Sequence, residues 1–341
     1  MKAARYYEAN KNLRIEDVPV KDPGSQELVV KVLASGICHS DLHAMNGVIP
    51  YASIPITPGH EGAGIVEAVG ANIQDLKVGD HVILRFVMSC GACAPCVQGT
   101  DNLCRKLKFL GFEVDGTFAE YVSVPSRHAI HLPDSIPFEQ GAIIGCAVVT
   151  PIHAMNIARV RPGSSVAIFG LGGVGIHAVQ TGKIFGAAEI FAVDISDSKL
   201  SLAKLFGANY AINGSKEDTV AEIKRLTDGV GVDFAFEFIG LPTTQLQAIS
   251  SVKRGGTVTL VGIPNQSLNI DLKYLLTNEI QLRTSFDHTR AEVDDVIRLV
   301  ESGRLDLSKS ISHRFPLSKV NEGIDVLRKN IGDPIRVVVT P

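Results

Sequence analysis

Hydrophobic and polar positions follow different patterns in the two halves of the chain. In the first half, short apolar runs such as ELVVKVLASG, AGIVEAVG, GDHVILRF and FAEYVSVP alternate with turns rich in Gly, Pro and Asp. Such runs between turn residues predict a domain built mostly of β-strands. The last run of the chain, IRVVVTP, has the same character, and we expect it to return to this first domain as a strand.

The second half alternates strand-like and helix-like segments. The runs SSVAIF, EIFAVD, VDFAFEFIG, GTVTLVGI and IQLRTSF are apolar and suit buried strands, and segments with helical spacing such as SKLSLAKLF separate the earlier ones. This alternation predicts a doubly wound parallel sheet. We therefore predict an α/β protein with a mostly-β domain over residues 1–149 and a parallel-sheet domain over 150–287. Residues 288–341 return to the first domain, and linkers are expected near 150–151 and 286–292.

Length and composition limit the classes of function. The chain has 341 residues, which is more than one core usually holds and favours two domains. The net charge is −3 and no basic stripe is present, so a nucleic-acid partner has no electrostatic support. The N-terminus has no apolar signal segment, and no apolar run approaches the roughly 18 residues of a spanning helix. We expect a soluble, cytoplasmic protein with reduced thiols and no membrane partner.

Four of the six cysteines fall within fifteen positions, as Cys90, Cys93, Cys96 and Cys104. A disulfide knot fits this spacing poorly, because cysteines so close in sequence do not pair easily. Four thiolates on short loops of small and turn-forming residues suit tetrahedral Zn²⁺. A closed four-sulfur site leaves no position for a substrate, so we predict a structural zinc that stabilises its loop.

The other two cysteines, Cys38 and Cys146, can form a second zinc site with His60. Each residue alone is weak evidence, since a lone buried cysteine or histidine is more often structural. Together they give two sulfurs and one imidazole, the ligand set of the open catalytic site in alcohol dehydrogenase. Glu61 follows His60 directly and could visit the metal as a further ligand. We therefore predict two Zn²⁺ per chain, one structural and one catalytic.

A glycine-rich turn between two predicted strands indicates a dinucleotide site. The turn consists of Gly170, Leu171, Gly172, Gly173, Val174 and Gly175. Gly170 permits the tight turn, Gly172 lets the backbone approach the pyrophosphate, and Gly175 lets the following helix pack closely. Asp194 lies 19 residues after the last glycine and would accept hydrogen bonds from the ribose hydroxyls. Because its carboxylate would repel a 2′-phosphate, we predict NAD over NADP; the alternative is that Asp194 only caps the next helix.

These motifs together resemble the zinc-dependent alcohol dehydrogenases of the medium-chain dehydrogenase/reductase superfamily. The zinc signature of that family is matched by Gly59, His60, Glu61, Gly64, Gly70 and Ile73, and the four-cysteine loop follows it. The resemblance runs nearly end to end. It implies a GroES-like catalytic domain, a Rossmann cofactor domain, and reversible hydride transfer between a primary or secondary alcohol and NAD⁺. It also implies a homotetramer, by analogy with bacterial and archaeal members of this length.

The resemblance also implies roles for single residues. Ser40 would take the proton of the alcohol, the nicotinamide ribose would pass it on, and His43 would deliver it to solvent. Asp41 would orient His60. The implied cofactor contacts are His39, Thr150, Lys199, Ile239, Val261, Ile263 and Arg336. Simpler alternatives stay open for these residues. Ser40 and His43 would be ordinary polar residues at the surface, the aliphatic residues would belong to the core of the strands, and Arg336 would form a salt bridge.

Other enzymes of the superfamily are the main competing interpretations. Polyol and threonine dehydrogenases share the signature, although Cys146 argues against the polyol type, which typically has glutamate there. Six ligand cysteines disfavour the zinc-free quinone reductases. A non-catalytic NAD(H)-binding relative is expected to have lost zinc ligands or the proton relay, and both are present here. The sequence does not identify the substrate, and aldehyde reduction is as credible as alcohol oxidation.

Overall fold

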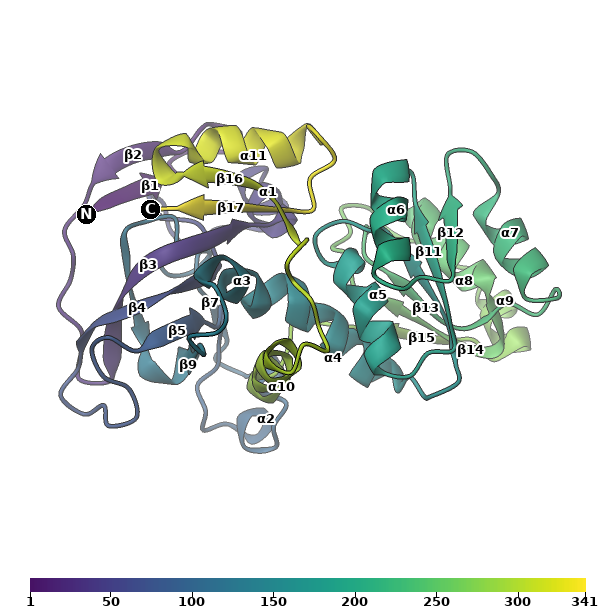
Figure 1. Cartoon of the computed structure of the whole chain (residues 1–341), viewed down its shortest axis with the longest axis horizontal. Coiled ribbons are helices and arrows are strands. Elements are labelled where there is room, and N and C mark those ends of the chain that lie inside the picture. The colour runs from purple at the N-terminus through teal and green to yellow at the C-terminus, as the bar shows by residue number, and fades with distance from the viewer. The chain divides into compact units, whose positions relative to one another are not determined.

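The computed structural model describes all 341 residues, and the chain divides into two compact units (Figure 1). Unit 1 combines Met1–Val149 with Asp287–Pro341, and unit 2 is Thr150–Phe286. Both chain termini lie in unit 1 (Figure 1). Unit 1 is therefore built from two stretches of chain that are far apart in sequence.

Unit 1 contains a sheet of seven strands in the order β16–β17–β3–β4–β5–β9, with β8 also paired to β3. Its strands are β1 (Lys2–Arg5), β2 (Arg14–Asp17), β3 (Glu27–Ile37), β4 (Glu61–Val69), β5 (His81–Leu84), β6 (Val87–Met88), β7 (Lys108–Phe109), β8 (Tyr121–Pro125), β9 (Ala129–His131), β16 (Ile311–Pro316) and β17 (Arg336–Thr340). The pairing is antiparallel except between β16 and β17. Val337 of β17 lies opposite Ile37 of β3, so the predicted C-terminal return strand is confirmed.

The helices of unit 1 are few and mostly short, which confirms the mostly-β prediction. They are α1 (His39–Met45), α2 (Ala94–Val97), α3 (Phe138–Ile143), α10 (Arg290–Glu301) and α11 (Val320–Arg328), with 3-10 turns at Asp101–Leu103, Ser126–His128 and Leu317–Lys319. Helix α11 covers β16 and β17 (Figure 1). Val320 and Ile324 of this helix pack with Val337 and Ile37 in one buried cluster. The core thus holds the C-terminal segment against the first 149 residues.

One helix, which begins in unit 1 and continues into unit 2, is longer than the sequence pattern indicated. It runs over 138–158, as α3, a π-helical turn at Ile144–Val148, and α4 (Val149–Ala158). By length and mean hydropathy this helix could cross a membrane, although Gln140, His153 and Asn156 interrupt its apolar run. Its most apolar window is 83% buried inside the protein, which accounts for the composition. The prediction of a linker near Pro151 is wrong, because the helix continues through that proline after the π turn.

Unit 2 is a six-stranded parallel sheet in the order β12–β11–β10–β13–β14–β15. Its strands are β10 (Ser165–Phe169), β11 (Glu189–Asp194), β12 (Tyr210–Asn213), β13 (Val232–Glu237), β14 (Val252–Leu260) and β15 (Gln281–Thr284). Its helices after α4 are α5 (Gly175–Ile184), α6 (Asp197–Leu205), α7 (Thr219–Leu226), α8 (Pro242–Ser251) and α9 (Leu272–Asn278). This confirms the Rossmann-type doubly wound sheet.

Helices cover both faces of the unit 2 sheet. Figure 1 shows α5 and α6 in front of the strands and α8 and α9 behind them. On the second face, Ile223 of α7 and Ile249 of α8 pack with Phe169 and Phe191 of the sheet. On the first face, Gly182 of α5 lies against Ile190 of β11. Successive strand residues point to opposite faces, and helices cover both. The strands are therefore apolar at nearly every position, as the sequence pattern predicted.

Candidate metal centres and cofactor loop

The four clustered cysteines bring their sulfur atoms together in unit 1. The Sγ–Sγ distances are 4.0 Å for Cys90–Cys96, 3.4 Å for Cys93–Cys96 and 3.7 Å for Cys93–Cys104. A tetrahedron of sulfurs about 2.3 Å from Zn²⁺ has edges of about 3.8 Å. The Cys104 sulfur also accepts backbone N–H groups from Cys90, at 3.2 Å, and Lys106, at 3.3 Å. N–H donors favour thiolates, so these four residues fit a tetrathiolate zinc site.

A buried carboxylate fixes the four-cysteine loop to the rest of unit 1. Asp101 accepts hydrogen bonds from Arg85 Nη1 at 2.6 Å, from Ser89 Oγ at 3.0 Å and from the Arg290 backbone N–H at 3.2 Å. Arg85 is itself buried and donates its other terminal nitrogen to the His288 carbonyl at 2.8 Å. The sequence interpretation missed this anchor, because a single Asp near cysteines carries no distinctive signal.

The second cluster joins Cys38, His60, Glu61 and Cys146, whose ligand atoms all lie within 4.8 Å of one another. All four residues are buried. His60 Nε2 and Glu61 Oε1 lie 4.0 Å apart, and neither has a hydrogen-bond partner. Buried polar atoms without partners are costly and rare, and a cation among them would satisfy both. The donor set of two sulfurs and one imidazole nitrogen fits Zn²⁺ with an open coordination position.

Three separate elements supply the second cluster. Cys38 is the N-cap of α1 at the end of β3, His60 and Glu61 stand at the start of β4, and Cys146 lies in the π-helical turn of the long helix. Gly36 pairs with Glu61 across the β3–β4 ladder. A side chain at Gly36 would overlap the Glu61 carboxylate, so the glycine makes room for it. π turns inside helices are frequent at functional sites.

Asp41 orients the imidazole of the second cluster. Its Oδ1 lies 3.0 Å from His60 Nδ1, and its Oδ2 accepts the Cys38 backbone N–H at 2.8 Å. Nε2 is therefore the nitrogen left to face the sulfurs. Burial alone would lower the pKa of His60, but the Asp41 carboxylate outweighs it and the pKa is raised. The rings of Phe86, at 4.9 Å, and Phe112, at 5.1 Å between centroids, flank this imidazole. No sequence pattern indicates either contact.

Arg336 pairs with the carboxylate of the second cluster. Its Nη2 donates to Glu61 Oε2, and both side chains are buried, at 3% and 0% exposure. Burial raises the pKa of Glu61, while the Arg336 charge opposes that shift. The salt bridge left open by the sequence is therefore present, and a phosphate contact from Arg336 stays a prediction. Arg336 Nε has no hydrogen-bond partner.

The predicted proton-relay residues lie on α1. The Ser40 Oγ is 3.8 Å from the Cys38 Sγ, so this hydroxyl borders the second cluster. His43 is three residues further along, on the same face of the helix, and is half-buried. Burial lowers the pKa of His43, with the Cys38 sulfur acting in the opposite direction. His39 opens the helix and is exposed.

The glycine-rich turn in unit 2 has the geometry of a phosphate-binding loop. Gly170 has φ +88°, which glycine adopts without strain. A Cβ at Gly172 would meet no protein atom within 4 Å, so the backbone there is open to a ligand. A Cβ at Gly175, the first residue of α5, would overlap the Gly170 carbonyl, so helix and turn can only be this close with glycine. Open space beside the start of a ten-residue helix fits a pyrophosphate.

Asp194 ends β11 and is held against this loop. Its Oδ2 accepts the Leu171 N–H at 2.7 Å, and its Oδ1 accepts the N–H groups of Ile195 at 2.8 Å and Ser196 at 3.0 Å. The N-cap of α6 is Ser196, whose Oγ accepts the Lys199 N–H. The alternative that Asp194 merely caps this helix is therefore wrong. Three backbone donors fix the carboxylate in place.

The aliphatic residues predicted at the nicotinamide are accessible. Ile239 is 40% exposed and Ile263 is 39% exposed, so the alternative that they are plain strand core is wrong for these two. Val261 has intermediate exposure. Thr150 lies about one helical turn after Cys146, in the first turn of α4. These positions leave the implied cofactor contacts as predictions.

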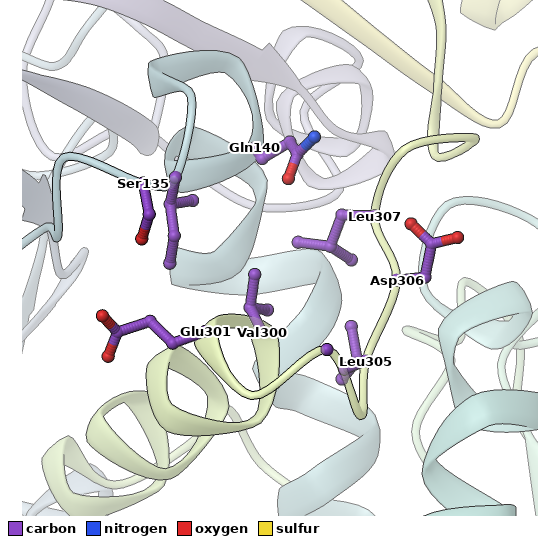
Figure 2. A pocket seen from close by; sticks show the side chains of 9 residues that line it. Ser135, Gln140, Val300, Glu301, Leu305, Asp306 and Leu307 are labelled. Atoms are coloured by element: carbon purple, nitrogen blue, oxygen red, sulfur yellow. The ribbon is translucent and has the colours of Figure 1, made fainter.

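Unit 1 also contains a pocket of about 370 Å³ whose lining includes none of the residues of the two metal clusters (Figure 2). Its lining residues are Ser135, Ile136, Gln140, Val300, Glu301, Gly303, Leu305, Asp306 and Leu307. Figure 2 shows aliphatic side chains at its centre and carboxylates at its edge. The lining contains no cysteine or histidine, and the carboxylates are exposed. The buried cluster at Cys38 is therefore the better candidate active site.

Comparison with known proteins agrees with both units. Residues 24–134 match the alcohol dehydrogenase GroES-like domain family, and residues 173–302 match the zinc-binding dehydrogenase family. An alcohol dehydrogenase of Geobacillus stearothermophilus is 35% identical over 338 residues, which cover 96% of each chain. A sorbitol dehydrogenase of Bacillus subtilis is 35% identical over 346 residues, covering 100% of this chain and 97% of the other. The structure of an alcohol dehydrogenase from the archaeon Aeropyrum pernix superposes with a TM-score of 0.92 at 32% identity, covering 100% of both chains.

Proposed function

Because this chain belongs to the zinc-type medium-chain dehydrogenase/reductase family, we propose that it is a zinc- and NAD-dependent alcohol dehydrogenase. The reaction would be reversible hydride transfer between a primary or secondary alcohol and NAD⁺, giving an aldehyde or ketone. The observation that carries this proposal is the buried cluster of Cys38, His60 and Cys146, in which His60 Nε2 has no partner. Family membership makes the protein an oxidoreductase of the alcohol dehydrogenase type.

Two groups of residues would hold zinc. Cys90, Cys93, Cys96 and Cys104 would hold a structural ion, and Cys38, His60 and Cys146 a catalytic one, with Glu61 as a further ligand. The catalytic ion, when bound, makes a hydroxyl more acidic and polarises a carbonyl. Glu61 pairs with Arg336 through Oε2, so its Oε1, which has no hydrogen-bond partner, would be the atom available to the metal.

Residues of the chain itself would transfer the proton and keep water out of the site. Ser40 lies beside the Cys38 sulfur, where its hydroxyl would accept the proton of the alcohol and release its own. His43 would deliver that proton to solvent, because it is half-buried and burial lowers its pKa, which favours the neutral imidazole that can accept a proton. Phe86 and Phe112 exclude water from the imidazole of His60. Asp41 keeps that imidazole in the metal-binding tautomer.

The cofactor proposal rests on Asp194 and the glycine-rich turn. The Asp194 carboxylate is held by three backbone N–H groups, so it cannot swing away from a 2′-phosphate, which it would repel. This supports NAD rather than NADP. The further residues that we assign to cofactor contacts are His39, Thr150, Leu171, Gly173, Val174, Lys199, Ile239, Val261, Ile263 and Arg336. Residues 150–287 would form the cofactor domain, and 1–149 with 288–341 the catalytic domain.

We also propose a homotetramer. Strand β15 is the edge of the unit 2 sheet, and Leu282 on it is 37% exposed. Helix α9 exposes Leu272 and Leu276, at 73% and 77%. An unpaired edge with apolar neighbours suits pairing with a second copy of the chain. Light scattering after size-exclusion chromatography measures the subunit number, and any number other than four would contradict the proposal. The six free cysteines are compatible with the proposed cytoplasmic location.

A polyol dehydrogenase is the second candidate, because one relative of 35% identity is a sorbitol dehydrogenase. Cys146 favours the alcohol type, since the resemblance implies glutamate at this position in polyol enzymes. The deciding experiment measures NADH formation from NAD⁺ with primary alcohols, secondary alcohols and polyols, and NADH consumption with the matching aldehydes and ketones. We expect turnover with simple alcohols and little with polyols. Turnover with polyols alone would favour the second candidate. No turnover at all by zinc-loaded protein would indicate a non-catalytic NAD(H)-binding relative.

A further inference from the structure

Unit 2 contains a completely buried carboxylate that the proposed mechanism does not use. Glu237 is the last residue of β13 and has 0% exposure. The residues that hydrogen-bond its carboxylate are Ile239, Gly240, Thr244 and Gln245, all of them uncharged. Burial raises the pKa of Glu237, and these hydrogen bonds act in the opposite direction. A buried acid without a cation is expensive, so its hydrogen bonds have to offset the cost of burying it.

The carboxylate fixes the turn that follows β13. Its Oε1 accepts the N–H groups of Ile239 and Gly240, each at 2.9 Å, and the Thr244 hydroxyl at 2.8 Å. Its Oε2 accepts the Gly240 N–H at 3.1 Å. Thr244 lies in the first turn of α8. A single side chain therefore ties the end of a strand, the turn after it and the start of the next helix.

The same residue also fixes the turn that follows β14. The Glu237 backbone carbonyl accepts the N–H groups of Val261 at 2.9 Å and Gly262 at 3.0 Å. The two turns touch backbone to backbone: a Cβ at Gly240 would overlap the Ile263 carbonyl, and a Cβ at Gly262 would overlap the Gly240 nitrogen. Any displacement of the first turn must therefore move the second.

These two turns carry the three aliphatic residues that we assign to the nicotinamide, namely Ile239, Val261 and Ile263. We infer that Glu237 is a positioning residue for the nicotinamide end of the cofactor site, because it holds both turns at the carboxyl ends of β13 and β14. This inference rests on the proposed NAD-binding function. The adenosine end of the site, at Asp194 and the glycine-rich turn, shares none of these hydrogen bonds.

The substitution Glu237→Gln tests this role with little change in size. A carboxylate only accepts hydrogen bonds, whereas an amide replaces one acceptor oxygen with an N–H donor group. That group would face the N–H or O–H donors that Glu237 now accepts, so the turns should shift while the strand stays in place. A matched control is Asp233→Asn. Asp233 lies near the opposite end of β13, where its Oδ2 accepts the Ser165 N–H at 2.8 Å and the Ser165 hydroxyl at 2.9 Å.

The experiment measures the dissociation constants of NADH and of ADP-ribose by titration calorimetry. ADP-ribose carries the adenosine and pyrophosphate but lacks the nicotinamide. We expect Glu237→Gln to weaken NADH binding about tenfold, with ADP-ribose binding unchanged within about twofold. Asp233→Asn should change neither constant. Thr244→Val removes one donor to Glu237 Oε1 and should also weaken NADH binding selectively, by a smaller factor. This variant tests the inference if Glu237→Gln does not fold.

The outcomes separate this inference from the proposed function. If the substitutions at Glu237 and Thr244 weaken NADH and ADP-ribose equally, or weaken neither, Glu237 is not a positioning residue for the nicotinamide end. If the unsubstituted protein binds neither NADH nor ADP-ribose, the NAD-binding proposal itself is refuted.

Discussion

The two cysteine clusters of unit 1 differ in how they are built. The four-cysteine loop draws its ligands from 90–104, and three of its four cysteines are half-exposed. The cluster of Cys38, His60 and Cys146 draws on three distant elements and is buried throughout. In the loop, backbone N–H groups already donate to the Cys104 sulfur, whereas His60 Nε2 in the buried cluster has no partner. A closed set of four sulfurs is typical of a structural metal site, whereas a buried set of three ligands leaves a coordination position for a substrate.

The difference also concerns what each metal would stabilise. A metal in the loop closes a short stretch of chain that has little apolar core of its own, so binding and local folding are linked. The buried cluster forms only after β3, β4 and the long helix have packed together. Its ligands are positioned by the fold, with Asp41 holding His60 from the other side. Removing a ligand should therefore cost activity at the buried cluster and stability at the loop.

The largest effect is expected for His60→Ala. Loss of this ligand should lower kcat/KM by at least about 10³-fold, equivalent to about 4 kcal/mol of transition-state stabilisation. The melting temperature should change little, because the core around the cluster remains. Initial rates of NADH formation and a thermal melt measure both quantities. His131→Ala, at an exposed histidine on β9, is the control and should leave both unchanged. Retention of a tenth of the activity in His60→Ala would refute the catalytic assignment.

The opposite pattern is expected for Cys93→Ala. Loss of this sulfur should lower the melting temperature by roughly 5–10 °C, which corresponds to about 2–3 kcal/mol at about 2–4 °C per kcal/mol for a domain of this size. The activity per folded molecule should stay within a few fold of the original. If Cys93→Ala abolished activity while the melting temperature stayed constant, the division between a structural and a catalytic site would be wrong.

A smaller effect is expected for Asp194→Gly, which touches neither cluster. Removing the carboxylate should reduce the preference for NAD over NADP by about tenfold or more, a change of about 1.4 kcal/mol per factor of ten. Both zinc ions should be retained. Values of kcat/KM with each coenzyme provide the measurement, and identical values before and after the substitution would exclude the ribose contact.

The effect that is smallest near neutral pH concerns the acid stability of the region that holds the four-cysteine loop. His128 is buried, and burial together with Arg85 and Arg127 lowers its pKa to about 3. Arg127 donates to the Cys90 carbonyl at 2.7 Å. The unfolded chain binds a proton at this histidine below about pH 6.5 and the folded chain does not, so stability falls as the pH drops from 6.5 towards 3.

His128→Gln removes this titration. The loss attributable to His128 is about 1.4 kcal/mol at pH 5.5, and it grows by about 1.4 kcal/mol for each further pH unit down to about 3. Urea unfolding between pH 7.5 and 4.5 should therefore give a flatter stability profile for His128→Gln than for the original protein. Parallel profiles would show that His128 titrates normally in the folded state.

Much of the fold follows from the hydrophobic pattern alone. The run EIFAVD is strand β11 to the residue, and the C-terminal run pairs with β3 as expected. The predicted strand at 232–240 ends earlier, at Glu237, because Gly240 turns with φ +88°. The long helix was missed because Pro151 interrupts its pattern, and only the π turn before that proline lets the helix continue.

The candidate sites were less uniformly predictable. Ligand types and spacing indicated both metal clusters, since few side chains bind zinc and all six cysteines are accounted for. The residues that hold the ligands in place carry no such signal. Asp101, Phe86 and Glu237 act through contacts with backbone groups or rings far away in the sequence, which only the folded chain brings together.

The most direct test of two clusters with different roles is a zinc count by elemental analysis. The original protein should contain close to two zinc ions per chain. His60→Ala and Cys93→Ala should each contain close to one, with activity lost only in the first. A single zinc in the original protein, retained in full by either variant, would contradict the presence of two separate metal sites.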